Sequence, residues 1–157
     1  MQLIGILLNI RSLHNVGSMF RTADGTGIKK LYLCGITPTP IDRFGRLQKE
    51  FAKTALGSEK NVEWKYEKSI TKLMNNLKKD GCAIYAIEQT ENSIQYNTLS
   101  KSKKKKGGAF IVGNEVSGIP PRVIAQCDDV LEIPMRGIKE SLNVSVAFGI
   151  IAYELKK

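Results

Sequence analysis

Apolar residues are grouped into short runs along the chain, and segments with helical periodicity separate these runs. Six of the runs are rich in Leu, Ile and Val and are typical of buried strands. They cover residues 3–8, 30–34, 62–66, 83–87, 109–112 and 130–133. Strands that alternate with helices predict an α/β fold, in which a mostly parallel sheet is flanked by helices.

Four of the intervening segments have helical features. The first carries an apolar face and then two glycines that are expected to end it: Val16, Met19, Phe20, Ala23, Gly25 and Gly27. The second is expected over residues 46–56, where apolar residues recur every four positions: Leu47, Phe51 and Ala55. The third has an apolar stripe that stops at a glycine: Ile70, Leu73, Met74, Leu77 and Gly81. A short helix with prolines in its first turn is expected over residues 120–126.

The last predicted helix, residues 142–155, is apolar on more than one face, with Val146, Phe148, Ile150 and Tyr153 among its apolar residues. A helix of this kind has to be covered on two sides. The sheet can cover one side, and a second copy of the chain is expected to cover the other, which predicts a homodimer. The alternative is burial of the whole helix within one chain.

Length and composition narrow the class of protein. A chain of 157 residues predicts a single domain over residues 1–157. The net charge of +9 favours a polyanionic partner, above all nucleic acid, although many basic proteins bind none. The three cysteines and single histidine lack metal-ligand spacing, so we expect reduced thiols in a cytoplasmic protein and no metal. No apolar run is long enough to cross a membrane, so no membrane partner is expected.

Two loops dense in Gly, Pro and small polar residues are associated with the last two predicted strands. Residues 111–120 read IVGNEVSGIP, and residues 133–147 read IPMRGIKESLNVSVA. Loops at the ends of parallel strands are where α/β proteins bind small ligands. These loops offer backbone groups and the Glu115 carboxylate, but neither a dinucleotide-binding nor a phosphate-binding glycine signature. This argues against an α/β enzyme of another class that uses a nucleotide cofactor.

These two segments, with NVGSMFR at residues 15–21, resemble the three motifs of the SpoU/TrmH family. This family belongs to the SPOUT class of S-adenosylmethionine-dependent RNA methyltransferases, and the resemblance runs from about Leu7 to Glu154. It implies a SPOUT fold, in which the C-terminal segment threads through a loop to form a deep trefoil knot. The sequence pattern alone predicts no knot, because knots are rare. The chain resembles a minimal member without the N-terminal RNA-binding domain that many relatives carry.

The resemblance implies S-adenosylmethionine as the cofactor, held by three loops that the knot brings together. The cofactor-binding residues it implies are Ile87, Gly113, Gly118, Ile133, Met135, Ser141 and Leu142. They would act largely through backbone groups, and glycine suits a close backbone approach. From residue type alone, Ile133 and Leu142 favour ordinary core packing, and the two glycines are equally typical of simple turns.

The same resemblance implies a catalytic set of Arg21, Asn15, Glu115, Ser141 and Asn143. Arg21 would either accept the proton of a ribose hydroxyl or bind a substrate phosphate with its planar fork, and in a dimer it could serve the partner's site. Asn15 is also expected to cap the first helix, and either Ser141 or Asn143 to cap the last. Glu115 is expected to orient an arginine or backbone amides; the alternative is hydrogen bonding within its own loop.

Basic residues in two regions are candidate RNA contacts: Arg43, Arg46, Lys103, Lys104, Lys105 and Lys106. They would attract the RNA backbone electrostatically. Charge runs are more often solvated loops, and this is the alternative for the four lysines.

The expected activity is therefore methyl transfer to a ribose 2′-hydroxyl of RNA. The resemblance is greatest to members that modify the D-loop guanosine of tRNA, so tRNA is the expected substrate. The alternatives are an rRNA 2′-O-methyltransferase, a base-modifying SPOUT methyltransferase and a non-catalytic RNA-binding relative. The presence of Arg21, Glu115, Ser141 and Asn143 argues against the last of these.

Overall fold

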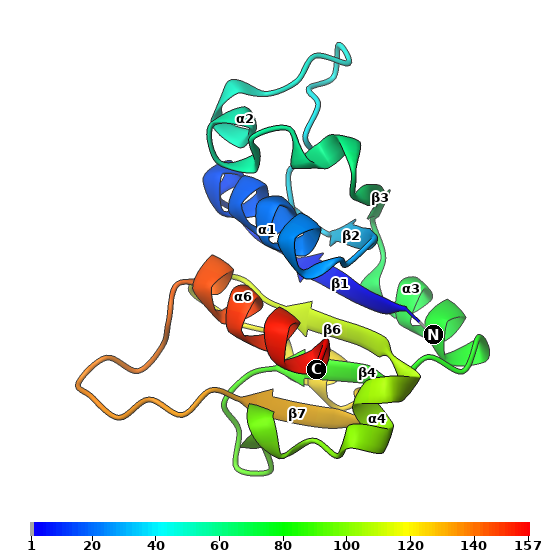
Figure 1. The fold of residues 1–157 in the computed structure, drawn as a ribbon, viewed down its shortest axis with the longest axis vertical. Coiled ribbons are helices and arrows are strands. Elements are labelled where there is room, and N and C mark those ends of the chain that lie inside the picture. Colours follow the sequence, from blue (N-terminus) through cyan, green and yellow to red (C-terminus); the bar gives the residue numbers. More distant parts are fainter. Residues whose placement is uncertain (1) are drawn as a thin grey trace.

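A computed structural model describes residues 2–157, which fold around one seven-stranded sheet (Figure 1). The strands are β1 (Leu3–Leu8), β2 (Lys30–Cys34), β3 (Glu63–Glu67), β4 (Ile84–Ile87), β5 (Ile94–Gln95), β6 (Gly108–Val112) and β7 (Asp129–Glu132). Their order across the sheet is β3-β2-β1-β6-β4-β7-β5, and every neighbouring pair is parallel. The predicted parallel α/β sheet is confirmed.

Helices cover both faces of this sheet. They are α1 (Leu13–Thr26), α2 (Lys49–Ala55), α3 (Ile70–Lys79), α4 (Lys101–Lys106), α5 (Pro121–Ile124) and α6 (Val144–Leu155), with 3-10 turns η1 (Ser58–Lys60) and η2 (Tyr96–Thr98). Figure 1 shows α1 and α6 side by side on one face and α3 on the other. α2 packs against α1 at one end of the molecule.

The central strands β1 and β6 divide the core into two layers, because successive strand residues point to opposite faces. Leu7 and Phe110 belong to the layer beneath α1 and α6, whereas Ile6 and Ile111 belong to the layer beneath α3 and α5. The ring of the fully buried Phe148 in α6 lies 5.0 Å from the ring of Phe110. α6 therefore packs directly on the middle of the sheet.

Several element boundaries differ from the sequence-based expectations. The second helix begins at Lys49 and not at residue 46, because Leu47 forms a β-bridge with Ile41 and is 46% exposed. The last helix begins at Val144, two residues later than expected. The lysine run forms α4, whose N-cap Ser100 accepts a hydrogen bond from the Lys103 amide, so these residues are helical and not the loop given above as the alternative. β5 was not predicted, because two residues are too short for a hydrophobic pattern.

The parallel strands place the loops that follow them at one edge of the sheet. One of these connections, residues 133–143 between β7 and α6, projects from the body of the molecule before the chain returns in α6 (Figure 1). This return brings the C-terminal helix beside α1, at the opposite end of the sequence. The threading of this segment into a knot stays a prediction.

Candidate functional site

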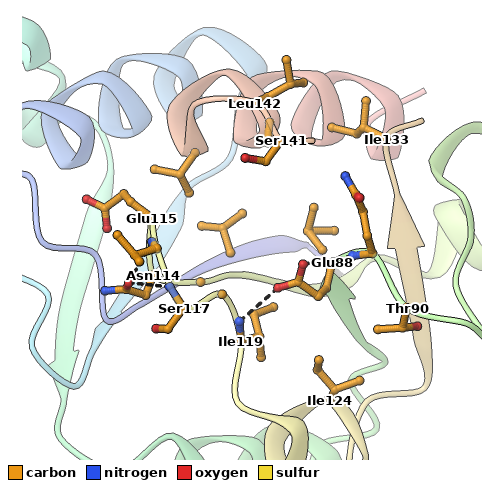
Figure 2. A pocket seen from close by; sticks show the side chains of 18 of the residues that line it. Glu88, Thr90, Asn114, Glu115, Ser117, Ile119, Ile124, Ile133, Ser141 and Leu142 are labelled. Carbon is orange, nitrogen blue, oxygen red and sulfur yellow. Dashed lines mark hydrogen bonds between the residues drawn. The ribbon is translucent and has the colours of Figure 1, made fainter. Parts of the chain in front are cut away.

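Loops that follow β4, β6 and β7 enclose a cavity of about 470 Å³ at this edge of the sheet (Figure 2). The seven residues expected to bind the cofactor all line it: Ile87, Gly113, Gly118, Ile133, Met135, Ser141 and Leu142. Glu115 and Asn143 of the expected catalytic set line it as well. A cavity of this size is within the range of roughly 300–1,000 Å³ that small-molecule sites occupy. The structure thus brings together three segments that are far apart in sequence.

The loop after β6 is a tight turn built on Asn114. The Asn114 side-chain oxygen accepts hydrogen bonds from the amides of Val116 (2.9 Å) and Ser117 (3.0 Å), and its carbonyl accepts one from Gly118 (3.0 Å). Gly118 has φ +69°, a left-handed conformation that favours glycine. A Cβ on Gly113 would lie 2.7 Å from the Gly118 carbonyl carbon. Both glycines therefore have a turn-forming role at the cavity wall.

Glu88 is a site residue that the sequence analysis did not select. It follows β4 directly, and Figure 2 shows its side chain in the middle of the cavity wall. One carboxylate oxygen accepts a hydrogen bond from the Ile119 amide at 3.1 Å, and the other accepts one from the Gln89 amide at 3.0 Å. Glu88 therefore connects the end of β4 to the loop after β6. A polar residue immediately after a buried strand was the available signal.

Glu115 connects the same loop to the start of α1. Its carboxylate accepts hydrogen bonds from the amides of Arg11 (2.9 Å) and Ser12 (3.0 Å), and these amides lie outside the loop that carries Glu115. Burial raises the pKa of Glu115. Hydrogen bonds from these amides and from the Asn15 side chain lower it by a larger amount, so the pKa of Glu115 lies below the ordinary value of a glutamate. The carboxylate is therefore ionised at neutral pH, and its contribution to stability is lost only as the pH falls through the lowered pKa.

Of the two expected helix caps, the one on α1 is wrong and the one on α6 is confirmed. Ser12, not Asn15, caps α1, and its hydroxyl accepts the Asn15 amide at 3.1 Å. Asn143 is the N-cap of α6 and accepts the Ser145 amide at 2.9 Å, so Ser141 is not the cap. The Asn143 side chain also donates to the Asn15 side-chain oxygen at 3.3 Å. Because Ser12 already satisfies the helix end, the Asn15 side chain is free to join α1 to α6 beside the cavity.

Arg21 lies apart from this cavity. It is an exposed residue of α1 and lines a second hollow together with Ser18, Thr22, Gly25, Lys53, Thr54 and Tyr153. This hollow is formed by α1, α2 and α6. Of the expected catalytic residues, Arg21 and Asn15 are the two that do not line the first cavity.

The lysine run is partly engaged within the molecule. Lys104 pairs with Glu154 of α6, and both side chains are nearly buried. Lys103 pairs with Asp129 at 2.7 Å. Among the described residues, no carboxylate pairs with Lys105 or Lys106, which are both exposed. The four lysines are therefore not equivalent candidates for RNA contact.

The charge of the cavity restricts its ligand. Among the residues of the described chain that line it, Glu88 and Glu115 carry the only charges, and both are negative. The remaining surface is apolar or neutral, with Ile87, Ile133 and Leu142 among the apolar walls. Such a lining disfavours an anionic phosphate and is compatible with a neutral or cationic ligand that has an apolar ring.

Two further findings concern ions and membranes. Within residues 2–157, no group of three or more His, Cys, Asp or Glu side chains is arranged to hold a metal ion. No helix in that part of the chain combines the length and apolar character needed to cross a membrane.

Comparison with known proteins identifies relatives of the whole chain. The tRNA (guanosine(18)-2′-O)-methyltransferase of Escherichia coli K12 is 30% identical over 144 residues, which are 92% of this chain and 58% of that protein. The chain thus spans about three fifths of the length of this curated relative.

Two solved structures share the fold. The TrmH/SpoU tRNA modifying enzyme of A. aeolicus has a TM-score of 0.84 at 28% identity, over 99% of this chain and 74% of that one. An AdoMet-bound rRNA methyltransferase from Sinorhizobium meliloti has a TM-score of 0.84 at 25% identity, over 98% of this chain and 55% of that one. The model of the SpoU rRNA Methylase family matches residues 2–153. With this match over nearly its whole length, the chain belongs to the SpoU rRNA Methylase family.

Proposed function

We propose that the chain transfers a methyl group from S-adenosylmethionine to a ribose 2′-hydroxyl of RNA, with tRNA as the expected substrate. The observation that carries this proposal is the cavity at the strand ends, where all seven expected cofactor residues converge and the charged side chains are carboxylates. The family membership and the E. coli relative, which acts on guanosine 18 of tRNA, support the same reaction.

The cavity suits the proposed cofactor in size and charge. Apolar walls from Ile87, Ile133 and Leu142 suit an adenine ring, and Gly113, which has no side chain, also lines the cavity. Bound S-adenosylmethionine would supply an electrophilic methyl group on a sulfonium cation. The carboxylates of Glu88 and Glu115 make the surroundings favourable for a cation. S-adenosylmethionine has no phosphate, and the described lining residues include no lysine or arginine that would bind one.

The acceptor side of the reaction is assigned to Arg21, Asn15, Glu115, Ser141 and Asn143. The hydrogen bond between Asn143 and Asn15 and the amide contacts of Glu115 hold the starts of α1 and α6 together beside the cavity. These residues would orient the ribose hydroxyl, because an in-line transfer depends on the alignment of donor and acceptor. An arginine side chain stays protonated at neutral pH, which favours Arg21 as a phosphate anchor over Arg21 as a free base.

A homodimer would explain how Arg21 can act in catalysis although it lies apart from the cavity of its own chain. Val146 and Tyr153 of α6 are 50% and 58% exposed, and Ile150 lies between them on the same helical stripe. Burial of the whole helix within one chain, the alternative above, is therefore wrong. Tyr153 lines the same hollow as Arg21. If a second copy covers this stripe, Arg21 lies at the interface and can serve the partner's cavity.

Methylation of RNA with labelled S-adenosylmethionine tests the proposal. Total RNA, purified tRNA and rRNA would be incubated with the protein, and the products digested to nucleosides. Label in a 2′-O-methylnucleoside from tRNA is the expected result. Label in rRNA alone would favour the rRNA enzyme, and label in a methylated base would favour a base-modifying enzyme. RNA binding without any transfer would favour the non-catalytic relative.

A further inference from the structure

The loop between β2 and α2 carries an exposed aromatic residue at its tip. Phe44 is 65% exposed, and the bridge between Ile41 and Leu47 closes the loop into a small hairpin. The loop, residues 36–48, extends beyond α2 at the end of the molecule, away from the C-terminus (Figure 1). Phe44 has no role in the methyl transfer proposed above.

The tip has a defined conformation. One carboxylate oxygen of Asp42 accepts hydrogen bonds from the amides of Phe44 (2.8 Å) and Arg46 (3.0 Å). The other accepts from the Arg46 guanidinium at 3.1 Å, and the Asp42 amide donates to the Arg46 carbonyl at 2.8 Å. Gly45 takes the left-handed conformation that such a turn requires, with φ +76°. Phe44 is therefore presented by a structured turn, which reduces the entropy lost on binding a ligand.

Two arginines flank the exposed ring. The guanidinium carbon of Arg43 lies 4.8 Å from the ring centroid of Phe44, and that of Arg46 lies 4.9 Å from it. Both distances are within the range of about 6 Å for a cation–π contact. An apolar ring beside two cations is a poor match for an apolar protein surface. It is a good match for a nucleotide, which combines a flat π-face with a phosphate.

The first residues of this loop lie beside the candidate cavity. The Asn9 side-chain oxygen accepts a hydrogen bond from the Ile36 amide at 3.1 Å. The Asn9 carbonyl accepts one from the Asn114 side chain at 2.8 Å, and Asn114 lines the cavity. Thr37 adds a buried contact, because its hydroxyl accepts the Ile10 amide at 3.0 Å. The aromatic tip and the cavity thus extend from the same edge of the sheet, so one RNA molecule can contact both.

We propose that residues 42–46 form a base-stacking tip that binds an unpaired nucleotide of the RNA substrate. The Phe44 ring stacks on the face of the base, and the guanidinium groups of Arg43 and Arg46 bind the adjacent phosphates. An exposed cation–π contact is weaker than stacking of a base on an aromatic ring, so a base can displace an arginine from the ring. The proposal rests on the proposed RNA function and adds to it a preference for unpaired over duplex RNA.

Binding measurements on Phe44 variants test this proposal. Affinity would be measured for a labelled single-stranded RNA and for a fully paired duplex of the same composition, over a series of salt concentrations. Phe44→Ala is expected to weaken single-strand binding by roughly tenfold, to leave the salt slope unchanged and to spare duplex binding. Phe44→Trp should restore affinity, because indole also stacks. Arg43→Ala should instead reduce the salt slope by about 0.7.

Leu56→Ala is the matched control, because Leu56 is 64% exposed but lies outside the tip. It is expected to bind like the wild type. In tRNA methylation, Phe44→Ala should raise the KM for RNA and leave kcat and S-adenosylmethionine affinity unchanged. Its thermal unfolding should match that of the wild type, because the ring is exposed.

Three outcomes would overturn the proposal. Wild-type affinity of Phe44→Ala for single-stranded RNA would remove the tip from recognition while leaving the proposed methyl transfer intact. If Phe44→Ala lost self-association but kept RNA binding, the ligand of the tip would be a second copy of the chain and not RNA. A wild-type protein that binds no RNA and transfers no methyl group would overturn both this proposal and the proposed function.

Discussion

Glu88 and Glu115 illustrate how single side chains organise the candidate site. Each is a carboxylate that accepts hydrogen bonds from two backbone amides, and each joins loops from different strands. Charge-assisted hydrogen bonds to backbone amides are among the stronger ones, at about 1.5–3 kcal/mol each. Since both residues line the cavity, their first role is to hold its walls in place.

Glu88→Gln is expected to weaken donor binding by about tenfold. Glutamine has one acceptor oxygen in place of two, so the Ile119 or Gln89 amide loses its charged partner and the loop after β6 loosens. Calorimetry should show a loss with both S-adenosylmethionine and S-adenosylhomocysteine, because the variant alters the cavity walls. The loss should be larger with S-adenosylmethionine, because the variant also removes a negative charge that favours the sulfonium cation. Glu91→Gln, an exposed carboxylate just beyond β4, serves as the control. A loss confined to the cationic ligand would contradict this positioning role.

Arg21→Ala should abolish methyl transfer while leaving S-adenosylmethionine affinity nearly intact. Arg21 lines a different hollow from the cofactor residues, so its removal should affect the RNA side of the reaction. A group that acts mainly in the transition state lowers turnover more than ground-state binding. Arg21→Lys should rescue poorly, because an ammonium lacks the planar fork. Single-turnover methylation and donor calorimetry measure both effects, and near-normal turnover of Arg21→Ala would exclude the residue from the mechanism.

At the scale of elements, α1 connects the two parts of the candidate site. Its start is held by Glu115 and Asn143, and its middle packs closely on α2. Gly17 makes this packing possible, because a Cβ there would lie 2.5 Å from the Phe51 carbonyl oxygen. Gly25, in the same helix, has open surroundings, and the Tyr153 hydroxyl would be the nearest atom at 3.5 Å.

Gly17→Ala and Gly25→Ala should therefore change stability in opposite directions. Alanine at position 17 would push α2 from α1 and destabilise the fold by about 1–3 kcal/mol, in spite of its better helix propensity. Alanine at position 25 should stabilise it by roughly 0.5–1 kcal/mol, because glycine is unfavourable inside a helix. Denaturant unfolding of both variants is the measurement. Destabilisation of equal size in both would show that the interhelical contact is not the cause.

At the scale of the whole molecule, α6 contributes residues both to the core and to the proposed dimer interface. Phe148 is fully buried against Phe110, so an aspartate at this position would report on folding and not on assembly. Val146 is half exposed on the opposite stripe. Position 146 is therefore the appropriate site for testing the dimer.

Val146→Asp should convert the proposed dimer into a folded monomer with reduced methyl transfer. A charge on the apolar stripe would have to be desolvated in the interface, which is costly without a partner. Light scattering gives the mass, and circular dichroism checks that the chain remains folded. Leu56→Asp, at another exposed apolar position, should leave the dimer unchanged. A monomeric wild type at working concentration would contradict the dimer.

The lysines of α4 should separate into two functional groups. Lys105→Ser with Lys106→Ser should lower the salt slope of RNA binding by about 0.7 for each lysine removed, without changing stability or the nucleotide modified. Lys104→Ser should instead destabilise the protein by about 1–3 kcal/mol, because Glu154 is nearly buried and would retain only Lys157 as a partner. An unchanged salt slope in the double variant would mean that α4 makes no contact with RNA.

The sequence by itself determined the central elements and the segments that form the cavity. Period-two and helical patterns are local, so β1, α1 and α3 could be predicted from neighbouring residues alone. The three motif segments were recognised by their resemblance to the family's motifs, and the structure places two of them around one cavity. The expected helix starts at Arg46 and Leu142 were wrong, because hairpin and cap geometry outweigh apolar periodicity at element ends.

Only the tertiary structure decided which distant residues meet. Glu88 contacts the Ile119 amide and Lys104 contacts Glu154, and neither pair has a local pattern in the sequence. Asn143 and Asn15 are 128 residues apart, and they meet because the chain returns in α6 beside α1. Likewise, the separation of Arg21 from the cavity depends on how α1 and α6 cross the sheet. Such contacts depend on the path of the whole chain, which short-range periodicity does not contain.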